Sequence, residues 1–267
     1  MTERFGAAIF TDVTTTLQVR IFHLKRGDQT PVFLHPFHGK DALGLLEKSE
    51  ITGVYGEEPR VEALTMFRNE LYRIVEDEVK NWIADTKFIP RFLISAGVFL
   101  IAYFVLSYAI RDPVPVLDEL SLSIAGAIVA YIALGKRYQQ SDAAMKKRMR
   151  IRGKVDRIVF QESRLVKRLE DVLHAYEKLD TRSALEHFEG AALKPLVEED
   201  REEAAEVLGY LTSMFSSKDH RRHEKRLRRN VSVRDGELSE TERWAESGKI
   251  DFPLFLLFLE IKLSLVD

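Results

Sequence analysis

The sequence predicts a mainly α-helical integral membrane protein. Its centre is a hairpin of two transmembrane helices, flanked by amphipathic or coiled-coil helices and preceded by a small β-hairpin element. Two apolar stretches, residues 92–110 and 120–134, are separated by a short turn, and the first carries no charge. A helix needs roughly 20 mainly apolar residues to cross the hydrocarbon core of a bilayer. Charged residues make up 31% of the chain, so we expect most of it to lie in water.

Residues 1–57 are expected to form a small cytoplasmic cap that contains strands. Leu17, Val19 and Ile21 alternate with polar residues, residues 25–28 have the composition of a turn, and residues 31–35 are again largely apolar. Two such runs around a polar turn are typical of a β-hairpin. Residues 41–48 then predict a short helix.

Residues 58–89 predict an amphipathic helix that leads to the membrane. Pro59 suits the first turn of a helix because its fixed φ is already helical, and we expect a break near Pro90. The apolar side chains recur at helical spacing along one face. They are Val61, Leu64, Phe67, Leu71, Ile74 or Val75, Val79 and Trp82.

Residues 90–135 are assigned to the transmembrane hairpin, with spans at about 91–110 and 114–135. The alternative is a pair of buried core helices in a soluble protein, but such helices rarely lack polar residues on every face. Basic residues flank the hairpin on the side of both termini, for example Lys87 and Arg91 before it and Lys136 after it. The positive-inside rule therefore places both termini in the cytoplasm, at the plasma or inner membrane if the chain is prokaryotic.

Residues 136–180 combine a basic juxtamembrane segment with a coiled-coil-like helix. The basic side chains lie where anionic headgroups would be, so we expect them to contact lipid. They are Lys146, Lys147, Arg148, Arg150, Arg152 and Lys154. Apolar residues at alternating steps of about three and four then predict one helix over 155–179, which either self-associates or packs on its own chain. We expect it to pack antiparallel to the helix that precedes the hairpin, with Leu71 and Leu169 in one shared core.

Residues 181–267 predict a cytoplasmic helical region with an apolar C-terminal segment. That segment, 252–266, contains Glu260 and Lys262 and is short for a third span. The basic run 218–229 could attract phosphate groups. It lacks the interleaved aromatic residues that single-stranded nucleic acid stacks on, so we favour a helix paired with the nearby acids 197–206 and do not expect nucleic acid as a partner.

No arrangement of nucleophile, base and orienting group can be traced, so the sequence does not predict an enzyme, a cofactor or a metal site. There are no cysteines, which excludes disulfides and thiolate ligands. His35 and His38 flank two residues, and His220 and His223 stand three apart, but neither pair has an obvious set of acids beside it. The predicted function is a membrane-anchored cytoplasmic scaffold, sensor or interaction protein. Its expected partners are anionic lipids and either a second copy or another protein, bound through the helical stripes.

An oligomeric cation pore is the alternative function. Asp118 and Glu119 lie near the outer end of the hairpin, and a symmetric ring of such acids would attract cations to a pore entrance. The order of a β-containing domain, a helix, two spans with an acidic turn and a coiled coil is similar to the layout of the mitochondrial calcium uniporter pore subunit. That family carries a Trp-Asp-x-x-Glu-Pro signature, whereas the turn here reads Val-Leu-Asp-Glu-Leu-Ser-Leu from Val116. The resemblance is one of arrangement and does not extend to calcium selectivity.

Overall fold

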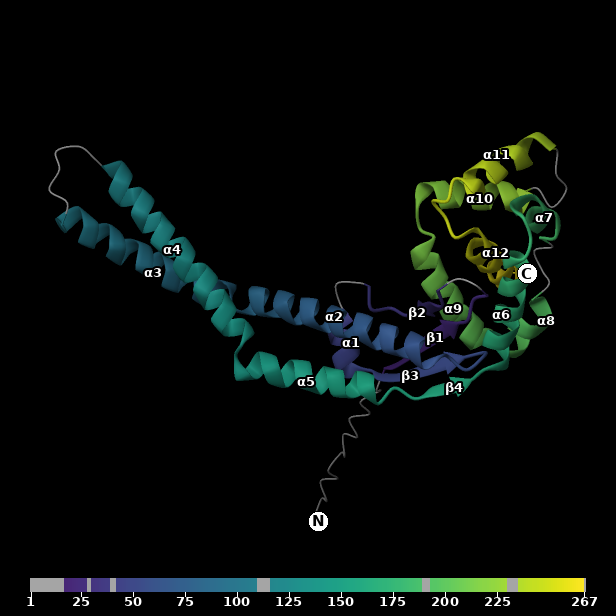
Figure 1. The fold of residues 1–267 in the computed structure, drawn as a ribbon, viewed down its shortest axis with the longest axis horizontal. Coiled ribbons are helices and arrows are strands. Elements are labelled where there is room, and N and C mark those ends of the chain that lie inside the picture. The colour runs from purple at the N-terminus through teal and green to yellow at the C-terminus, as the bar shows by residue number, and fades with distance from the viewer. Residues whose placement is uncertain are drawn as a thin grey trace, which may run out of the picture.

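The computed structural model describes residues 17–27, 30–38, 42–109, 116–188, 193–229 and 235–266, and the molecule is elongated (Figure 1). One end is an arm of two long helices, α3 (Phe88–Ala109) and α4 (Val116–Gln139). A stalk of α2 (Val61–Thr86) and α5 (Asp142–Asp156) connects the arm to a body. The body consists of a small sheet, α1 (Ala42–Lys48) and the helices after the sheet. The chain is mostly helical, as the sequence predicts.

The sheet has the strand order β2-β1-β3-β4. Strands β1 (Gln18–Leu24) and β2 (Val32–Leu34) are antiparallel, with Phe22 opposite Leu34, which confirms the predicted β-hairpin. Helix α1 confirms the predicted short helix and leads to β3 (Glu50–Tyr55), which is parallel to β1. Strand β4 (Phe160–Glu162) is parallel to β3 and comes from the far side of the hairpin in sequence.

The arm therefore lies inside the connection between two neighbouring parallel strands. Parallel strands need a crossover, which is usually a helix. Here the crossover comprises the stalk helices, and the arm is inserted between them. Backbone hydrogen bonds extend the pairing at both ends of β4: the amide of Gly53 donates to the carbonyl of Val159 (2.8 Å), and the amide of Ser163 donates to that of Tyr55 (2.8 Å). Both ends of the crossover are thus fixed to one sheet.

Alternate residues of β1 pack on opposite faces of the sheet, since successive strand side chains point to opposite sides. Val19 and Ile21 join a stalk core with α1, α2 and α5, whereas Phe22 and Leu24 join a body core with the later helices. The stalk core contains Val19, Ile21, Phe37, Ala42, Leu43, Leu46, Phe67, Leu71, Val75, Val79, Ile83, Ala144, Ile151, Val155 and Ile158. The sheet is thus covered by helices on both faces.

The body core is built around the C-terminal helix α12 (Phe252–Val266), which lies among the surrounding helices (Figure 1). Most of its side chains are buried. The other helices of this region are α6 (Arg164–Glu177), α7 (Thr181–Glu186), α8 (Lys194–Glu199), α9 (Arg201–Met214), α10 (Lys218–Arg229) and α11 (Asp235–Glu246). In the structure the apolar C-terminal segment is a core helix of the body.

The predicted continuous helix over 155–179 is wrong. Helix α5 ends at Asp156, the chain forms β4, and α6 begins at Arg164. Ile158, Val159 and Phe160, just before and at the start of β4, are β-branched or aromatic and suit a strand that pairs with β3. Ser163 then caps α6, because its hydroxyl accepts a hydrogen bond from the amide of Val166 at 3.3 Å.

The predicted packing partner of the pre-hairpin helix is also wrong. Leu71 of α2 lies in the stalk core against α5, whereas Leu169 of α6 lies in the body core. The apolar seam read from the sequence is divided between the two faces of the sheet. Most residues of both predicted stripes are buried or half-buried within the chain, so the stripes give no support to self-association, which stays a prediction.

Candidate functional site

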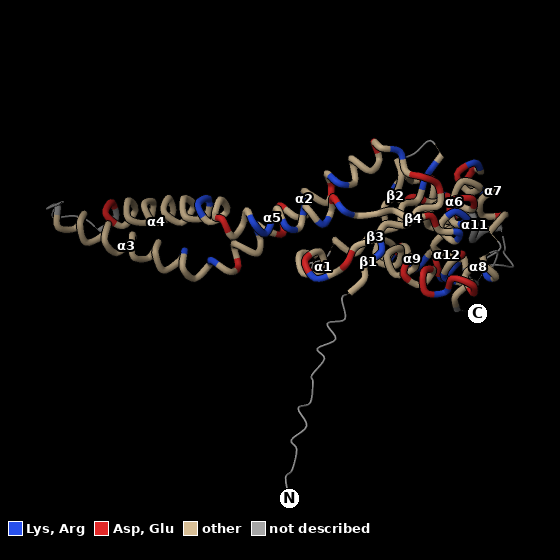
Figure 2. Tube along the Cα trace, turned by 90° about the horizontal axis from the view of Figure 1, so that it is seen from below, with Lys and Arg blue, Asp and Glu red and all other residues tan. Residues whose placement is uncertain are grey.

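The arm exposes apolar side chains along its whole length. By length and composition alone, α3 and α4 are each able to cross a membrane. Only 6% of the most apolar segment of α3 and 11% of that of α4 are buried inside the protein. Figure 2 shows the arm as largely uncharged, with acidic residues at the outer end of α4 and basic residues at its base. The most exposed large apolar side chains of the arm are Ile89, Phe92, Leu93, Ile101, Phe104, Val105, Tyr108, Leu122 and Val129.

Basic and aromatic side chains meet where the arm joins the stalk. The guanidinium of Arg91 lies 4.0 Å from the ring centroid of Tyr131 and donates to that residue's carbonyl at 3.2 Å. Gly135 makes room for it, because a Cβ there would lie 2.5 Å from Arg91 Nη2. Lys87 lies over the ring of Tyr138 at 5.9 Å. Such belts of aromatic residues and cations are typical of a membrane–water interface.

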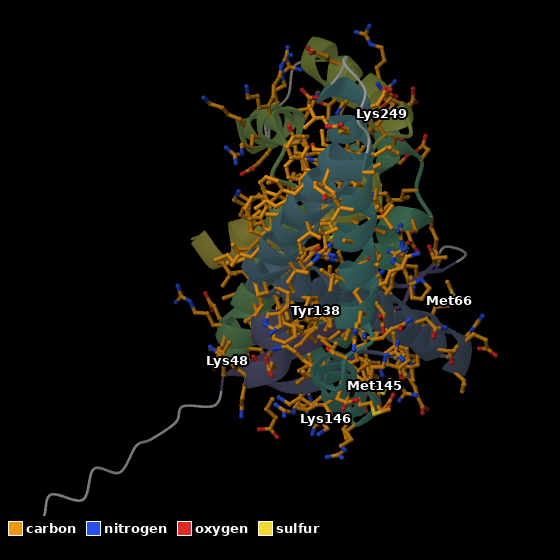
Figure 3. The ribbon with its side chains drawn as sticks, turned by 90° about the vertical axis from the view of Figure 1, so that its left-hand side faces the viewer. Lys48, Met66, Tyr138, Met145, Lys146 and Lys249 are labelled. Carbon is orange, nitrogen blue, oxygen red and sulfur yellow. The ribbon has the colours of Figure 1, made fainter. Side chains whose placement is uncertain are left out.

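Most of the basic segment predicted to contact lipid is bound within the protein. Two acids hold four of its members: the ion pairs join Lys147 and Arg150 to Glu47, and Arg148 and Arg152 to Glu76. The ammonium of Lys154 donates to the carbonyls of Glu47 and Ser49. Lys146 is exposed, lies at the edge of the molecule in Figure 3, and has no such contact with any residue that the structure describes. Lipid contact by this segment stays a prediction, centred now on Lys146.

The acids of the predicted pore entrance lie at the outer end of α4. Asp118 is exposed, and Glu119 accepts a hydrogen bond from the hydroxyl of Ser107 on α3 at 2.8 Å. Glu119 therefore links the two helices of one arm. The turn between them, residues 110–115, lies outside the described residues.

His220 and His223 belong to an aromatic cluster in the body. The ring of His223 stacks on Trp244 with centroids 4.0 Å apart, and His220 lies edge-on to Phe215. The basic helix α10 that carries them forms ion pairs within its own chain, but not with the expected acids 197–206: Arg222 and Arg226 bind Glu240, and Glu224 binds Lys262.

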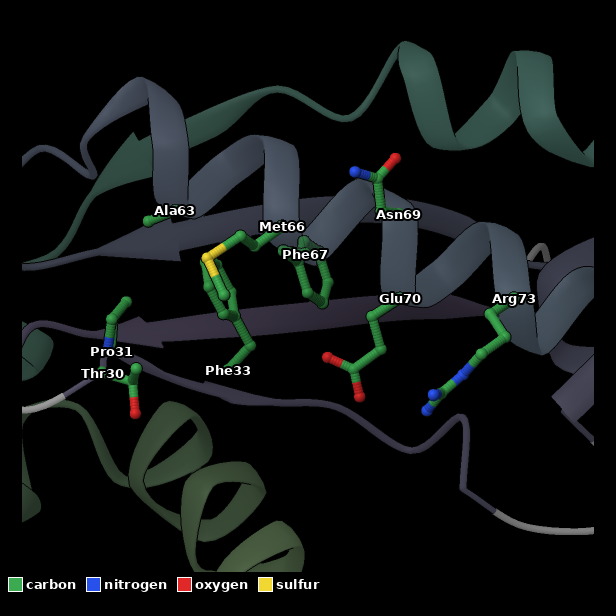
Figure 4. Close-up of a pocket in the computed structure, with 9 residues that line it drawn as sticks. All are labelled: Thr30, Pro31, Phe33, Ala63, Met66, Phe67, Asn69, Glu70 and Arg73. Carbon is green, nitrogen blue, oxygen red and sulfur yellow. The ribbon is translucent and has the colours of Figure 1, made fainter.

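The other histidine pair meets an acid that the sequence did not reveal. Potential ligand atoms of His35, His38 and Glu70 all lie within 4.8 Å of one another. His35 is buried, and burial together with nearby His38 lowers its pKa to about 4, so its imidazole is neutral at pH 7. Glu70 also lines a cavity of about 460 Å³ under α2, together with Phe33, Met66 and Arg73 (Figure 4).

A second buried titratable group lies between β1 and α6. Glu170 is 2% exposed, and its Oε1 accepts a hydrogen bond from the amide of Lys25 at 2.8 Å and lies 4.0 Å from Nδ1 of His23. Burial raises the pKa of Glu170 to about 7. Burial, with a contribution from Lys25, lowers the pKa of His23 to about 4. A Cβ at Gly56 would lie 2.4 Å from Glu170 Oε2, so this glycine admits the carboxylate.

Comparison with family models, curated proteins and solved structures gives no match for this chain. Sequence reasoning missed two groups of residues, and only the first of them has a recognisable signal in the sequence. The aromatic belt had a signal, because Tyr131 and Tyr138 stand close to the C-terminal end of the second predicted span. Glu70 had none, since it is one of many acids on α2 and meets the histidines only in the folded chain.

Proposed function

We propose that this protein is a membrane-anchored scaffold or sensor, in which the α3–α4 arm spans a bilayer and holds the body at the membrane surface. The observation that carries this proposal is the uncovered apolar surface of the arm. Soluble monomers rarely expose contiguous apolar patches larger than a few hundred Å². Two apolar helices that leave the body side by side need a cover, and lipid provides one along their whole length.

The dimensions of the arm suit this role. At 1.5 Å per residue, the 22 residues of α3 and the 24 of α4 are about 33 and 36 Å long. The hydrocarbon core of a bilayer is about 30 Å thick. An open apolar hollow of about 370 Å³, lined by Phe92, Phe99 and Tyr131 among others, lies between the two helices and is of a kind that acyl chains fill.

The charges favour one orientation. The body end of the arm carries Lys87, Arg91 and Lys136, whereas the outer end carries Asp118 and Glu119. By the positive-inside rule the body then lies in the cytoplasm and the turn outside. Lys146, at the start of the stalk, would be the member of the basic segment available to an anionic headgroup.

The stalk supports a role in presenting a surface. Helix α5 has 15 residues, so it is about 22 Å long, and α2 runs beside it. The sheet and the C-terminal helices lie at the opposite end of the stalk from the arm (Figure 1). A body placed in this way has its surface free for partners in the aqueous phase.

Single-cysteine labelling would test the topology, because the natural chain contains no cysteine. Asp118→Cys places a thiol at the outer end of the arm, and Lys48→Cys and Lys249→Cys place thiols on exposed sites of the body, at the positions marked in Figure 3. Intact cells would be treated with a membrane-impermeant maleimide. We expect labelling of the Asp118→Cys variant alone, and labelling of all three after lysis.

The proposal fails if the protein leaves washed membranes in alkaline carbonate, or if a body thiol is labelled in intact cells while Asp118→Cys is protected. A pore would give the same labelling, so it is separated by ion flux from reconstituted vesicles. We expect no cation flux from the wild-type protein.

A further inference from the structure

The cluster of His35, His38 and Glu70 brings together the side chains that bind transition-metal ions. The turn after β2 places the two histidine rings beside each other, with centroids 4.2 Å apart. Glu70 reaches them from α2, which crosses the same side of the sheet. Two imidazoles and one carboxylate form a ligand set that proteins use for zinc and for iron(II), with the remaining coordination positions open.

We propose that His35, His38 and Glu70 bind a divalent transition-metal ion, with zinc as the reference ion, beside the cavity under α2 that Glu70 also lines. This site lies in the body, so it goes beyond membrane anchoring and can be tested whether or not the arm spans a bilayer. It would give the proposed scaffold or sensor a ligand of defined chemistry.

The geometry needs only a small adjustment. Ligand atoms lie about 2.0–2.2 Å from zinc, so neighbours in a tetrahedral site are about 3.4 Å apart. The three atoms here lie within 4.8 Å of one another, so a contraction of up to about 1.4 Å would bring them to zinc-binding distances. The ring contacts of His35 with Phe37 and Phe67 hold it in place. His38 is exposed and can move toward it.

One hydrogen bond sets a cost for ion binding. Nδ1 of His35 accepts a bond from the amide of Phe37 at 3.2 Å, so in the ion-free ring the proton sits on Nε2. If the ion binds Nε2, the proton must move to Nδ1. If the ion binds Nδ1, it takes the place of the Phe37 amide. Either route loses a long and therefore weak hydrogen bond in exchange for a metal bond.

The cavity supplies space for the open coordination positions. Its wall includes Glu70 and, one turn further along α2, Arg73, and both side chains point toward the strand side in Figure 4. Water or an anionic ligand can complete the coordination there. The positive charge of Arg73 opposes a bare cation, so its removal should not weaken metal binding and gives a matched control on the same wall.

Calorimetric titration of the full-length, untagged protein with ZnCl₂ would test the site, after treatment with EDTA and dialysis in detergent. We expect one ion per chain. Loss of a direct ligand should exceed the 10–100-fold effect of losing an outer partner, so His38→Ala and Glu70→Gln should each weaken binding by more than about 100-fold. Arg73→Gln and the exposed His187→Ala should bind one ion at least as tightly as the wild type.

Cobalt(II) gives a second readout, because a four-coordinate site absorbs visible light and its spectrum should be lost in the same two variants. Circular dichroism would establish that each variant is folded. Unchanged zinc affinity in folded His38→Ala and Glu70→Gln would overturn the proposal. So would the absence of stoichiometric zinc and cobalt binding by the wild-type protein.

Discussion

Helices α3 and α12 are both strongly apolar, yet one is exposed and the other is buried. Ile101 of α3 is 68% exposed, whereas Leu257 of α12 is fully buried. The 15 residues of α12 are about 22 Å long, too short for a bilayer core of about 30 Å, while α3 is about 33 Å long. Apolar composition thus identifies a helix that needs a cover: protein covers α12, and α3 is long enough for the proposed bilayer to cover it.

The charged residues of the two helices also differ in where they lie. Glu260 of α12 is buried and accepts a hydrogen bond from the hydroxyl of Tyr176 at 2.8 Å, and Lys262 pairs with Glu224 at 2.6 Å. A protein can supply such partners in its interior, and lipid tails cannot. The charged residue of α3, Arg91, lies at the base of the helix instead.

The same substitution in both helices should have opposite effects and gives the largest expected change. Leu257→Arg places an unpaired charge in the body core and should prevent folding, because the cost of several kcal/mol approaches the whole stability of a domain. Ile101→Arg should leave the body folded and should disfavour membrane insertion by about 2.5–3.5 kcal/mol. Protease resistance of the body and recovery in carbonate-washed membranes measure the two effects. A body that unfolds with Ile101→Arg would show that the arm packs on protein.

Leucine-to-alanine substitutions should reduce the stability of the body when they lie in either core and should change it little when they lie in the arm. Leu71→Ala and Leu169→Ala each remove a fully buried side chain and should cost about 2–5 kcal/mol. The two residues lie in different cores, so the double variant should be additive to within about 0.5 kcal/mol. Leu100→Ala, at a half-exposed site of α3, should change the stability of the body little. Urea unfolding in detergent measures the stability of all four variants. A double variant that departs strongly from additivity would show that the two leucines share one core.

The pH dependence of stability should reveal the titratable groups that the body buries. The raised pKa of Glu170, about 7 against an ordinary 4.5, means that the folded body keeps a proton that the unfolded chain releases between those values. Its contribution is therefore full below about pH 4.5 and is lost as the pH rises to about 7. The lowered pKa of His23, about 4 against 6.5, acts in reverse, and its contribution is lost as the pH falls from about 6.5 to 4.

The two contributions should largely cancel in the wild type. Glu170→Gln should make stability rise with pH between 4.5 and 6.5, and His23→Gln should make it fall, by up to about 3 kcal/mol in each case. Lys25 shifts both pKa values and Glu57 shifts that of Glu170, so slopes should be compared rather than single points. Urea midpoints at several pH values measure the slopes. If stability changed with pH in the same direction in both variants, the assignment of the two opposing pH dependences to Glu170 and His23 would be wrong.

The smallest expected effect is at the acidic end of the arm. Replacing Asp118 and Glu119 by Asn and Gln should leave insertion and assembly unchanged, since an exposed carboxylate such as that of Asp118 contributes little to stability and Gln at position 119 keeps an acceptor for the Ser107 hydroxyl. Cation flux from reconstituted vesicles provides the measurement. A reproducible wild-type cation current that these two substitutions abolish would favour the pore over the anchor.

Periodicity predicted the local elements well and their partners poorly. The β-hairpin, the short helix predicted at 41–48, the amphipathic helix and the two long apolar helices follow from the spacing of apolar residues. The apolar stripe over 155–179 misled because residues 158–160 suit a strand as well as a helix, and only the free edge of β3 decides between them. Glu70 shows the same limit, because no local pattern indicates which of several acids on one helix will meet a histidine pair from another segment.

The position of the arm between β3 and β4 has a consequence for the order of biosynthesis. Strand β3 is made before the arm and β4 after it, so the fourth strand can be added only when a loop of residues 56–159 has closed. The entropic cost of closure grows with the length of a flexible loop. Inserted as proposed, the arm would return α2 and α5 to one membrane face and leave two short rigid segments to bring together. The bilayer would then hold the two ends of the crossover in position for β4 to pair with β3, and the sheet would be completed only after the arm is inserted.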